Sequence, residues 1–298
     1  PGIIDGQGKQ GVSEKIFLDY DQEQLNHQYH NPAWAPNLAE VVGSYATLSA
    51  PAYDRLEVRR DIRYDPAPGA LLDVFPAKAP SSPVFVFIHG GQWQKLSKEE
   101  SAFAAEEFVA EGAAWVAVGF DMIPHVPLDE IVRQNREAIA WVWRNAASMN
   151  GDPARVFVGG HSSGGHLTAM MATTDWRATN GLSQNPIAGA MCVSGNYDLH
   201  PLNLSHRGGY LKLDEAGVIR NSPIRHLQHL DCPLIVAAGD GETDEFRRQA
   251  RTFGEAVTAE GKPCDYFEID GRNHFECILD MREPDTRLGA AVRRQIGL

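Results

Sequence analysis

A serine stands at the centre of the pentapeptide Gly160-His161-Ser162-Ser163-Gly164, which has the pattern G-x-S-x-G. The motif directly follows the apolar run Val156–Val158 and opens a stretch of helical character, Ser163–Thr173. A sharp turn from a strand into a helix projects the serine Oγ, and small flanking residues let the chain pass without collision. Only Ser162 fits the pattern, because Ser163 would need glycine at position 161. We therefore predict that Ser162 is a nucleophile.

A second motif, His89-Gly90-Gly91-Gln92-Trp93, comes immediately after the uniformly apolar run Val84–Ile88. A nucleophile that attacks an acyl carbon needs preorganised N–H donors for the oxyanion that forms. Such donors are supplied by the residue after the nucleophile and by a loop that follows an earlier strand, where glycine permits close approach of the backbone. We predict that the backbone N–H groups of Gly91, Gln92 and Ser163 form an oxyanion hole.

A general base is expected near the C-terminus, in Gly271–Glu276, after a predicted strand. His274 alone among the histidines has the chain order serine, acid, histidine and the loop placement that this arrangement requires. Its role would be to accept the Ser162 proton and later to donate it to the leaving group. His166 lies four residues beyond the nucleophile and is interpreted as a packed or surface histidine. The chain has eleven histidines, and other competitors among them are His200, His206, His226 and His229.

The acid of the triad is expected in the loop after the predicted strand Pro233–Ala238. This loop offers Asp240, Glu242, Asp244 and Glu245. The last two begin a predicted helix, where first-turn carboxylates interact favourably with the helix dipole. The pattern of residues leaves the choice between Asp240 and Glu242 open.

Short apolar runs alternate with amphipathic stretches of helical length through most of the chain, which predicts βαβ units and a mostly parallel sheet. The predicted strands are Leu56–Tyr64, Leu71–Phe75, Val84–Ile88, Trp115–Phe120, Arg155–Val158, Ala188–Val193, Pro233–Ala238 and Asp265–Ile269, the first two forming a hairpin at the sheet edge. The predicted helices are Lys98–Glu111, Leu128–Ala147, Ser163–Thr173, Asp244–Glu260 and a last one from Asp285. We expect one domain, 1–298, with an α/β fold.

Two segments lie outside this alternation. Residues 1–55 are predicted to be irregular and polar, apart from a helical piece at Glu23–Tyr29, and to lie near the active site. Residues 196–230 interrupt the pattern between two sheet strands. Long insertions at the carboxyl end of such a sheet commonly cover the active site, so we expect a small cap there. A surface loop with a short helix is the alternative.

The charge of the chain excludes some partners. With 27 Lys+Arg against 39 Asp+Glu the net charge is −12, which repels phosphate backbones and anionic membrane surfaces. We expect neither nucleic acid nor a membrane as partner. Residues Pro1–Gly11 contain no apolar leader-like run, so a cytoplasmic, soluble protein is expected. Its four cysteines, Cys192, Cys232, Cys264 and Cys277, have no metal-type spacing and are expected to be free thiols.

With these residues in hand, the chain resembles the kynurenine formamidases (arylformamidases) of the α/β-hydrolase superfamily. The resemblance runs from about residue 25 onward. Its strongest parts are the segment 89–101, with the pattern H-G-G-x-W and its continuation, and the nucleophile helix from Gly160 to Met171. Further matching segments are Gln28-Tyr29, Pro32–Trp34, Val193–Gly195, Asp198-Leu199, Asn221–Pro223, Glu245-Phe246, Arg248-Gln249 and His274–Glu276.

The resemblance implies an α/β-hydrolase fold and assigns the triad acid to Glu242, where animal members carry aspartate. It implies hydrolysis of a small N-acyl aryl amine such as N-formylkynurenine, with no metal or organic cofactor. Trp93, Tyr29, Trp34 and Phe275 would form an aromatic substrate-binding wall. A carboxylesterase, or an amidase for N-acylanthranilate-type substrates, is the alternative. Position 92, a tyrosine in some relatives, is glutamine here, and a homodimer is one of the oligomeric states left open.

Overall fold

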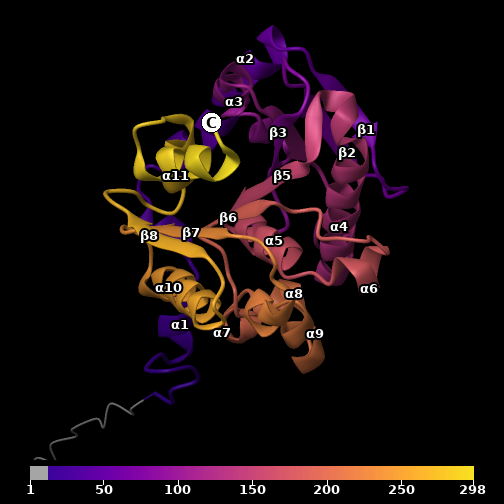
Figure 1. The fold of residues 1–298 in the computed structure, drawn as a ribbon. Coiled ribbons are helices and arrows are strands. Elements are labelled where there is room, and N and C mark those ends of the chain that lie inside the picture. The colour runs from indigo at the N-terminus through magenta and orange to yellow at the C-terminus, as the bar shows by residue number, and fades with distance from the viewer. Residues whose placement is uncertain (1–12) are drawn as a thin grey trace, which may run out of the picture.

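A computed structural model describes residues 13–298, and its centre is one sheet of eight strands (Figure 1). The strands lie in the order β1-β2-β4-β3-β5-β6-β7-β8. The pairs β1/β2 and β2/β4 are antiparallel, and every later pair is parallel, as predicted. Their bounds are β1 Arg59–Arg63, β2 Leu71–Phe75, β3 Ser82–Ile88, β4 Ala114–Val118, β5 Gly151–His161, β6 Gly189–Val193, β7 Leu234–Gly239 and β8 Cys264–Ile269.

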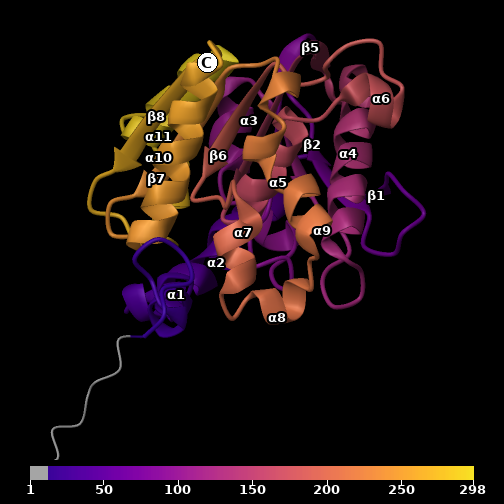
Figure 2. The same ribbon diagram turned by 90° about the horizontal axis from the view of Figure 1, so that it is seen from below.

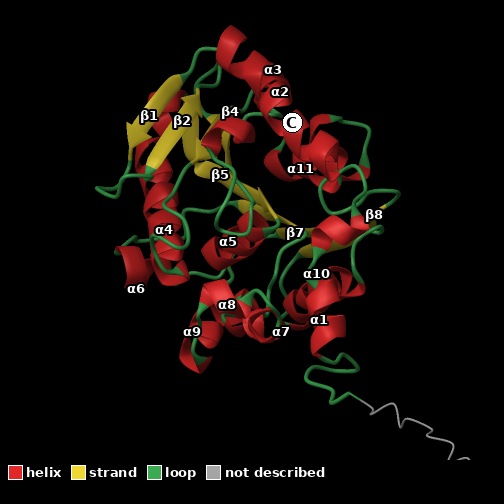
Figure 3. Ribbon diagram, turned by 180° about the vertical axis from the view of Figure 1, so that it is seen from behind, coloured by secondary structure: helices red, strands yellow, loops and turns green. Residues whose placement is uncertain are grey.

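Helices cover both faces of this sheet, so its central strands are apolar on both sides. On β3, Val84, Val86 and Ile88 belong to one core and Phe85 and Phe87 to the other. The first face carries α4 (Leu128–Asn145), α5 (Ser163–Ala172) and α10 (Asp244–Ala259), and the second carries α2 (Leu38–Arg55), α3 (Ala105–Glu111) and α11 (Arg287–Ile296). Figure 3 shows the yellow sheet enclosed between these red helices.

Helix α2 corrects the prediction that residues 1–55 are irregular apart from one short helix. It spans 18 residues, Leu38–Arg55. Its buried residues are Val41, Tyr45, Ser49 and Ala52, spaced four, four and three apart, which is one stripe of a helix. Two of these four residues are small or polar, and the apolar pattern was therefore too weak to reveal the helix. The strand predicted from Leu56 begins only at Arg59, because α2 extends to Arg55.

The other elements lie close to their predicted positions. The helix predicted over Lys98–Glu111 is divided into a 3₁₀ turn, Lys98–Ser101, and α3. Strand β5 is longer than predicted and ends at His161, directly before Ser162. The N-terminal helix α1 occupies Gln22–Gln28, and a 3₁₀ turn follows at Asn31–Trp34. The prediction for Pro1–Gly11 concerns residues outside the described part of the chain.

The insertion between β6 and β7 folds into three short helices, α7 (Leu199–Leu204), α8 (Gly208–Leu211) and α9 (Glu215–Arg220), followed by two 3₁₀ turns. They lie on the outer side of α5 (Figure 2), while α6 (Trp176–Asn180) lies next to α4. Helix α1 joins the insertion through a hydrogen bond from Gln22 Nε2 to the Leu204 carbonyl, 2.9 Å long. Within residues 13–298, no helix is long and apolar enough to cross a membrane.

Candidate active site

Ser162 occupies the turn between β5 and α5 in a strained conformation with positive φ, at φ +58° and ψ −121°. The chain is crowded here. A Cβ on Gly160 would lie 2.3 Å from the Gly164 carbonyl oxygen, and a Cβ on Gly164 would lie 2.1 Å from the Ile88 carbonyl oxygen. Both flanking positions therefore require glycine, which is the physical content of the G-x-S-x-G pattern.

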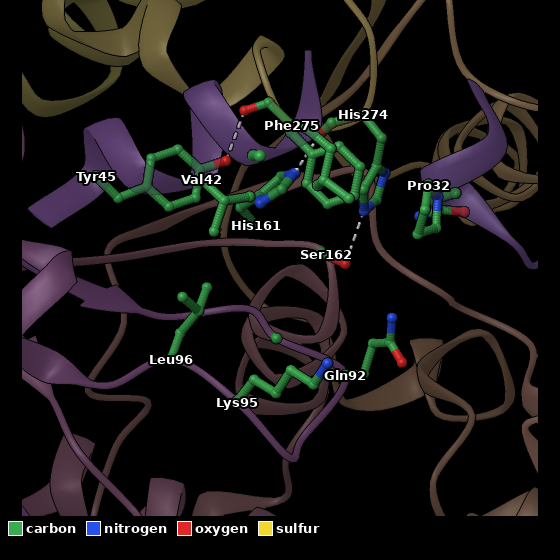
Figure 4. Close-up of a pocket in the computed structure, with 14 residues that line it drawn as sticks. Pro32, Val42, Tyr45, Gln92, Lys95, Leu96, His161, Ser162, His274 and Phe275 are labelled. Atoms are coloured by element: carbon green, nitrogen blue, oxygen red, sulfur yellow. Dashed lines mark hydrogen bonds between the residues drawn. The ribbon is translucent and has the colours of Figure 1, made fainter. Parts of the chain in front are cut away.

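The structure brings His274 to the candidate nucleophile. His274 Nε2 lies 2.9 Å from Ser162 Oγ, and His274 Nδ1 lies 2.6 Å from Glu242 Oε2 (Figure 4 shows the first contact). Because a carboxylate can only accept, the proton of the neutral imidazole belongs on Nδ1. Nε2 is then left to accept a hydrogen bond from the Ser162 hydroxyl, as a general base must.

Glu242 is buried, with both carboxylate oxygens engaged. Oε2 contacts His274, while Oε1 accepts hydrogen bonds from Ser194 Oγ at 2.5 Å and from the Gly239 backbone N–H at 2.7 Å. Cys277 Sγ lies 3.2 Å from Ser194 Oγ and donates to the His274 carbonyl oxygen at 3.3 Å. The ends of β6 and β7 thus fix the rotation of this carboxylate.

The other acidic residues of this loop point elsewhere. Asp240 is exposed, and its Oδ1 accepts from the Gly271 backbone N–H at 2.8 Å. Asp244 is exposed in the first turn of α10. Glu245 is buried and pairs with Arg248 at 2.7 Å and with the Tyr29 hydroxyl at 2.9 Å. Of the acids that the sequence offered, Glu242 is the one hydrogen-bonded to His274.

The loop after β3 is a tight turn with several left-handed residues: φ is +98° at Gly91, +60° at Gln92, +59° at Trp93 and +64° at Leu96. The Gly91 carbonyl accepts from the Lys95 N–H at 2.9 Å, and the Trp93 N–H donates to Ser163 Oγ at 3.2 Å. The first bond closes the turn, and the second connects the loop to the start of α5. In residues 13–298, the N–H groups of Gly91, Gln92 and Ser163 have no acceptor, so all three remain available as donors.

A pocket of about 300 Å³ opens over Ser162 (Figure 4). One wall comes from the N-terminal segment: Asn31, Pro32, Leu38, Ala39, Val42 and Tyr45. The rest comes from the two motifs and the histidine loop: Gly91, Gln92, Lys95, Leu96, His161, Ser162, His274 and Phe275. Of the two segments expected near the active site, the N-terminal one lines this pocket, and none of residues 196–230 does.

The predicted aromatic wall is placed differently. Phe275 lines the pocket, but Trp93, Tyr29 and Trp34 do not. Trp93 is buried edge-on against His166, with ring centroids 5.2 Å apart, and Tyr29 is buried with its hydroxyl on Glu245. Trp34 packs on His27 at the surface and is 37% exposed. These three side chains serve packing in this structure.

Two lining residues that were not predicted from the sequence, Tyr45 and His161, form hydrogen bonds to the histidine loop. Tyr45 of α2 donates from its hydroxyl to the Phe275 carbonyl at 2.6 Å, and the stripe of α2 was the only available signal. His161 is the variable residue inside the nucleophile motif. Its Nε2 lies 2.6 Å from the His274 carbonyl oxygen. Burial, and then the neighbouring His274, hold the pKa of His161 well below the ordinary value, so it acts as a neutral donor.

The competing histidine His166 lies buried in α5, and its Nε2 donates to the Asn221 carbonyl at 2.7 Å. Burial lowers the pKa of His166 to about 4. It is a packed histidine, as interpreted from the sequence. The four cysteines are free thiols, and within residues 13–298 no group of three or more His, Cys, Asp or Glu side chains is arranged to hold a metal ion.

Comparison with known proteins gives a family match and several relatives. A family model described as BD-FAE matches residues 72–193. The chain is 31% identical over 289 residues to the kynurenine formamidase of Danio rerio, covering 93% of this chain and 97% of that protein. It is 30% identical to the kynurenine formamidase of Salmo salar, covering 94% and 98%. Esterase LipC of Mycobacterium tuberculosis is 26% identical, covering 74% and 60%.

Solved structures agree with the described fold. A Silicibacter sp. TM1040 protein, assigned provisionally as a thioesterase, has a TM-score of 0.78 at 25% identity and covers 90% of this chain and 98% of its own. The carboxylesterase EstE1, cloned from a metagenomic library, has a TM-score of 0.66 at 18% identity and covers 95% and 97%. At that identity the second likeness concerns the fold alone.

Proposed function

Because the chain belongs to the kynurenine formamidase family of α/β-hydrolases, we propose that it is a serine hydrolase of small N-acyl aryl amides of the formyl type, such as N-formylkynurenine. The observation that carries this proposal is the hydrogen-bonded series Ser162–His274–Glu242 at the floor of a small apolar pocket. The pocket volume of about 300 Å³ favours short acyl groups and an aryl leaving group.

In the proposed reaction, Ser162 Oγ attacks the acyl carbon while His274 Nε2 takes its proton. The backbone N–H groups of Gly91, Gln92 and Ser163 hold the oxyanion of the tetrahedral intermediate. His274 then protonates the departing aryl amine, and an acyl-enzyme remains. Water, activated by the same histidine, hydrolyses this ester and regenerates Ser162. With a formyl substrate the products are formate and the free aryl amine.

A second candidate is a carboxylesterase, or an amidase of N-acylanthranilate-type amides. It is favoured by the similarity to esterase LipC. The same three side chains would cleave an ester, because only the leaving group differs. An alkoxide or phenoxide leaves more readily than an amine and depends less on protonation by His274.

The test is a panel of kcat/KM values for N-formylkynurenine, N-acylanthranilates of increasing acyl length and p-nitrophenyl esters. We expect formyl and acetyl amides to exceed longer acyl amides. Faster turnover of octanoyl than of formyl anilides would move the enzyme to the second candidate. Absence of turnover on every member by a folded protein would overturn the proposal.

A further inference from the structure

Lys95 is the one side chain with a permanent charge among the described residues that line the pocket over Ser162. Within residues 13–298, no aspartate or glutamate lines this pocket. The chain as a whole carries a net charge of −12, so the positive charge of this pocket is opposite in sign to that of the whole protein. This local charge is the observation from which the inference starts.

Lys98, three residues further along the chain, differs from Lys95 in having acidic partners. Lys98 Nζ lies within 2.9 Å of carboxylate oxygens of Asp61, Asp73 and Glu99, and this lysine is buried among them. Lys95 forms no ion pair with any residue of 13–298, and its side chain is exposed. Its ammonium group therefore has three donors available for a bound molecule.

The turn that carries the predicted oxyanion donors also fixes the position of this lysine. The Lys95 N–H donates to the Gly91 carbonyl at 2.9 Å. A Cβ on Gly91 would lie only 2.0 Å from the Lys95 carbonyl oxygen, so the turn is closely packed at this point. Figure 4 shows Lys95 and Gln92 together on the side of Ser162 opposite His274. The backbone from which the Lys95 side chain extends is thus held by the same turn as the predicted oxyanion donors.

The remaining wall of the pocket accepts an aromatic ring. Leu38, Val42, Leu96 and Phe275 present apolar surface, and Gln92 and Asn31 are neutral. A carboxylate on that ring would meet the Lys95 ammonium, whereas a substrate ammonium group would find no carboxylate on the pocket wall.

We propose that the substrate of this pocket is an aryl amide or ester that carries a single negative charge, and that Lys95 selects it over neutral and zwitterionic analogues. N-acylated 2-aminobenzoates have this chemistry. The inference rests on the proposed function and, of its two candidates, favours the N-acylanthranilate-type amides over zwitterionic N-formylkynurenine; it makes Lys95 a specificity-determining residue.

The test compares 2-formamidobenzoate, which is anionic, with 2-formamidobenzamide, its neutral analogue of the same shape. We expect wild type to prefer the anion, and Lys95→Gln to lower the ratio of the two kcat/KM values about tenfold, the scale of one partly exposed charge-assisted hydrogen bond. Lys95→Arg should retain most of the ratio. Zwitterionic N-formylkynurenine should be a poorer substrate than the anion.

The matched control is Lys78→Gln. Lys78 is also exposed, and it precedes β3, at the end of the sheet opposite to Ser162. This variant should keep the wild-type ratio. A wild-type ratio near one, or a ratio unchanged in Lys95→Gln, would overturn the inference.

A binding measurement separates this inference from the proposed function. In a Ser162→Ala background, calorimetry should show that 2-acetamidobenzoate binds more tightly than 2-acetamidobenzamide, and that adding Lys95→Gln removes the difference. If no amide or ester is hydrolysed by wild type, the proposed function fails while this result still decides the role of Lys95. Equal binding of the two ligands would contradict it.

Discussion

The carboxylate of Glu242 has a hydrogen-bond partner on each of its oxygens, and this decides how it can act on His274. Ser194 and the Gly239 N–H hold Oε1, which leaves Oε2 directed at His274 Nδ1. A carboxylate held in this way fixes the histidine tautomer and stabilises the imidazolium that forms during the reaction. Either an aspartate or a glutamate carboxylate can perform these two functions.

Replacement of Glu242 by glutamine removes the charge and keeps the shape. In a serine protease the equivalent change costs about 10⁴ in kcat, so we expect Glu242→Gln to lower kcat by roughly 10³ to 10⁴. Asp240→Asn should leave kcat nearly unchanged, because Asp240 braces the loop from an exposed position. Asp244→Asn should cost only a helix-terminus effect of roughly 0.3–1 kcal/mol in stability.

Steady-state kinetics on the three purified variants make this comparison, with circular dichroism to verify folding. An inactive but folded Asp240→Asn or Asp244→Asn, together with an active Glu242→Gln, would show that the acid is assigned to the wrong residue.

The positions of some site residues could be predicted from the sequence, and those of others could not. Ser162 and the loop at Gly91 were predictable because their motifs meet backbone requirements, namely a turn with positive φ and close chain contacts that only glycine permits. Trp93 and Tyr29 were not, because an aromatic residue beside a motif can face the pocket or the core. The choice depends on residues distant in sequence, here His166 and Glu245.

The turn from Gly91 to Leu96 joins several proposed functions in one element. It carries two predicted oxyanion donors and the Lys95 ammonium, and its Trp93 N–H is hydrogen-bonded to the start of α5. A change in the backbone of this turn should therefore lower the catalytic rate more than it lowers the stability of the fold.

Gly91→Ala tests this at the level of the element. An added Cβ would lie 2.0 Å from the Lys95 carbonyl oxygen, so the turn must rearrange and displace the donors. We expect kcat to fall about 10²- to 10³-fold, the scale of losing one oxyanion donor. Gly112→Ala is the control, because Gly112 has φ +108° but nothing within 4 Å of its Cβ. It should lose about 1 kcal/mol of stability and no activity. Loss of activity in Gly112→Ala alone would contradict this account.

Among the elements, the alternating strands and helices could be read from the sequence, and α2 could not. Strands such as β3 are continuous apolar runs because helices cover both faces of the sheet. Helix α2 contacts the rest of the protein through a narrow stripe that includes Ser49 and Ala52. Because these two residues are small or polar, the sequence of α2 shows only a weak hydrophobic pattern. The pocket wall supplied by Tyr45 and Val42 was hidden for the same reason.

Burial lowers the pKa of three histidines, His89, His161 and His166, and this links the stability of the whole molecule to pH. Burial lowers the pKa of His166 to about 4, while an unfolded histidine titrates near 6.5. Below that value the unfolded chain binds a proton that the folded protein does not, so stability present above pH 6.5 is lost as the pH falls toward 4. Burial also lowers the pKa of His161, which acts in the same direction.

We expect His166 to account for about 2 kcal/mol of the decrease in the free energy of unfolding between pH 7 and pH 5. His166→Gln keeps a donor for the Asn221 carbonyl and removes the titration, so its unfolding free energy should depend less on pH. His200→Gln, at an exposed histidine, should behave as wild type. Urea denaturation at the two pH values is the measurement, and an unchanged pH dependence in His166→Gln would show that this histidine is not the cause.

The central claim is that Ser162 is the nucleophile of this enzyme, and active-site labelling tests it most directly. A fluorophosphonate should react once per wild-type chain, with the adduct located by mass spectrometry on Ser162. Ser162→Ala should remain unlabelled and should retain only the residual rate that the oxyanion hole and substrate binding provide. An adduct on Ser163, or labelling and turnover of Ser162→Ala at the wild-type rate, would contradict the account.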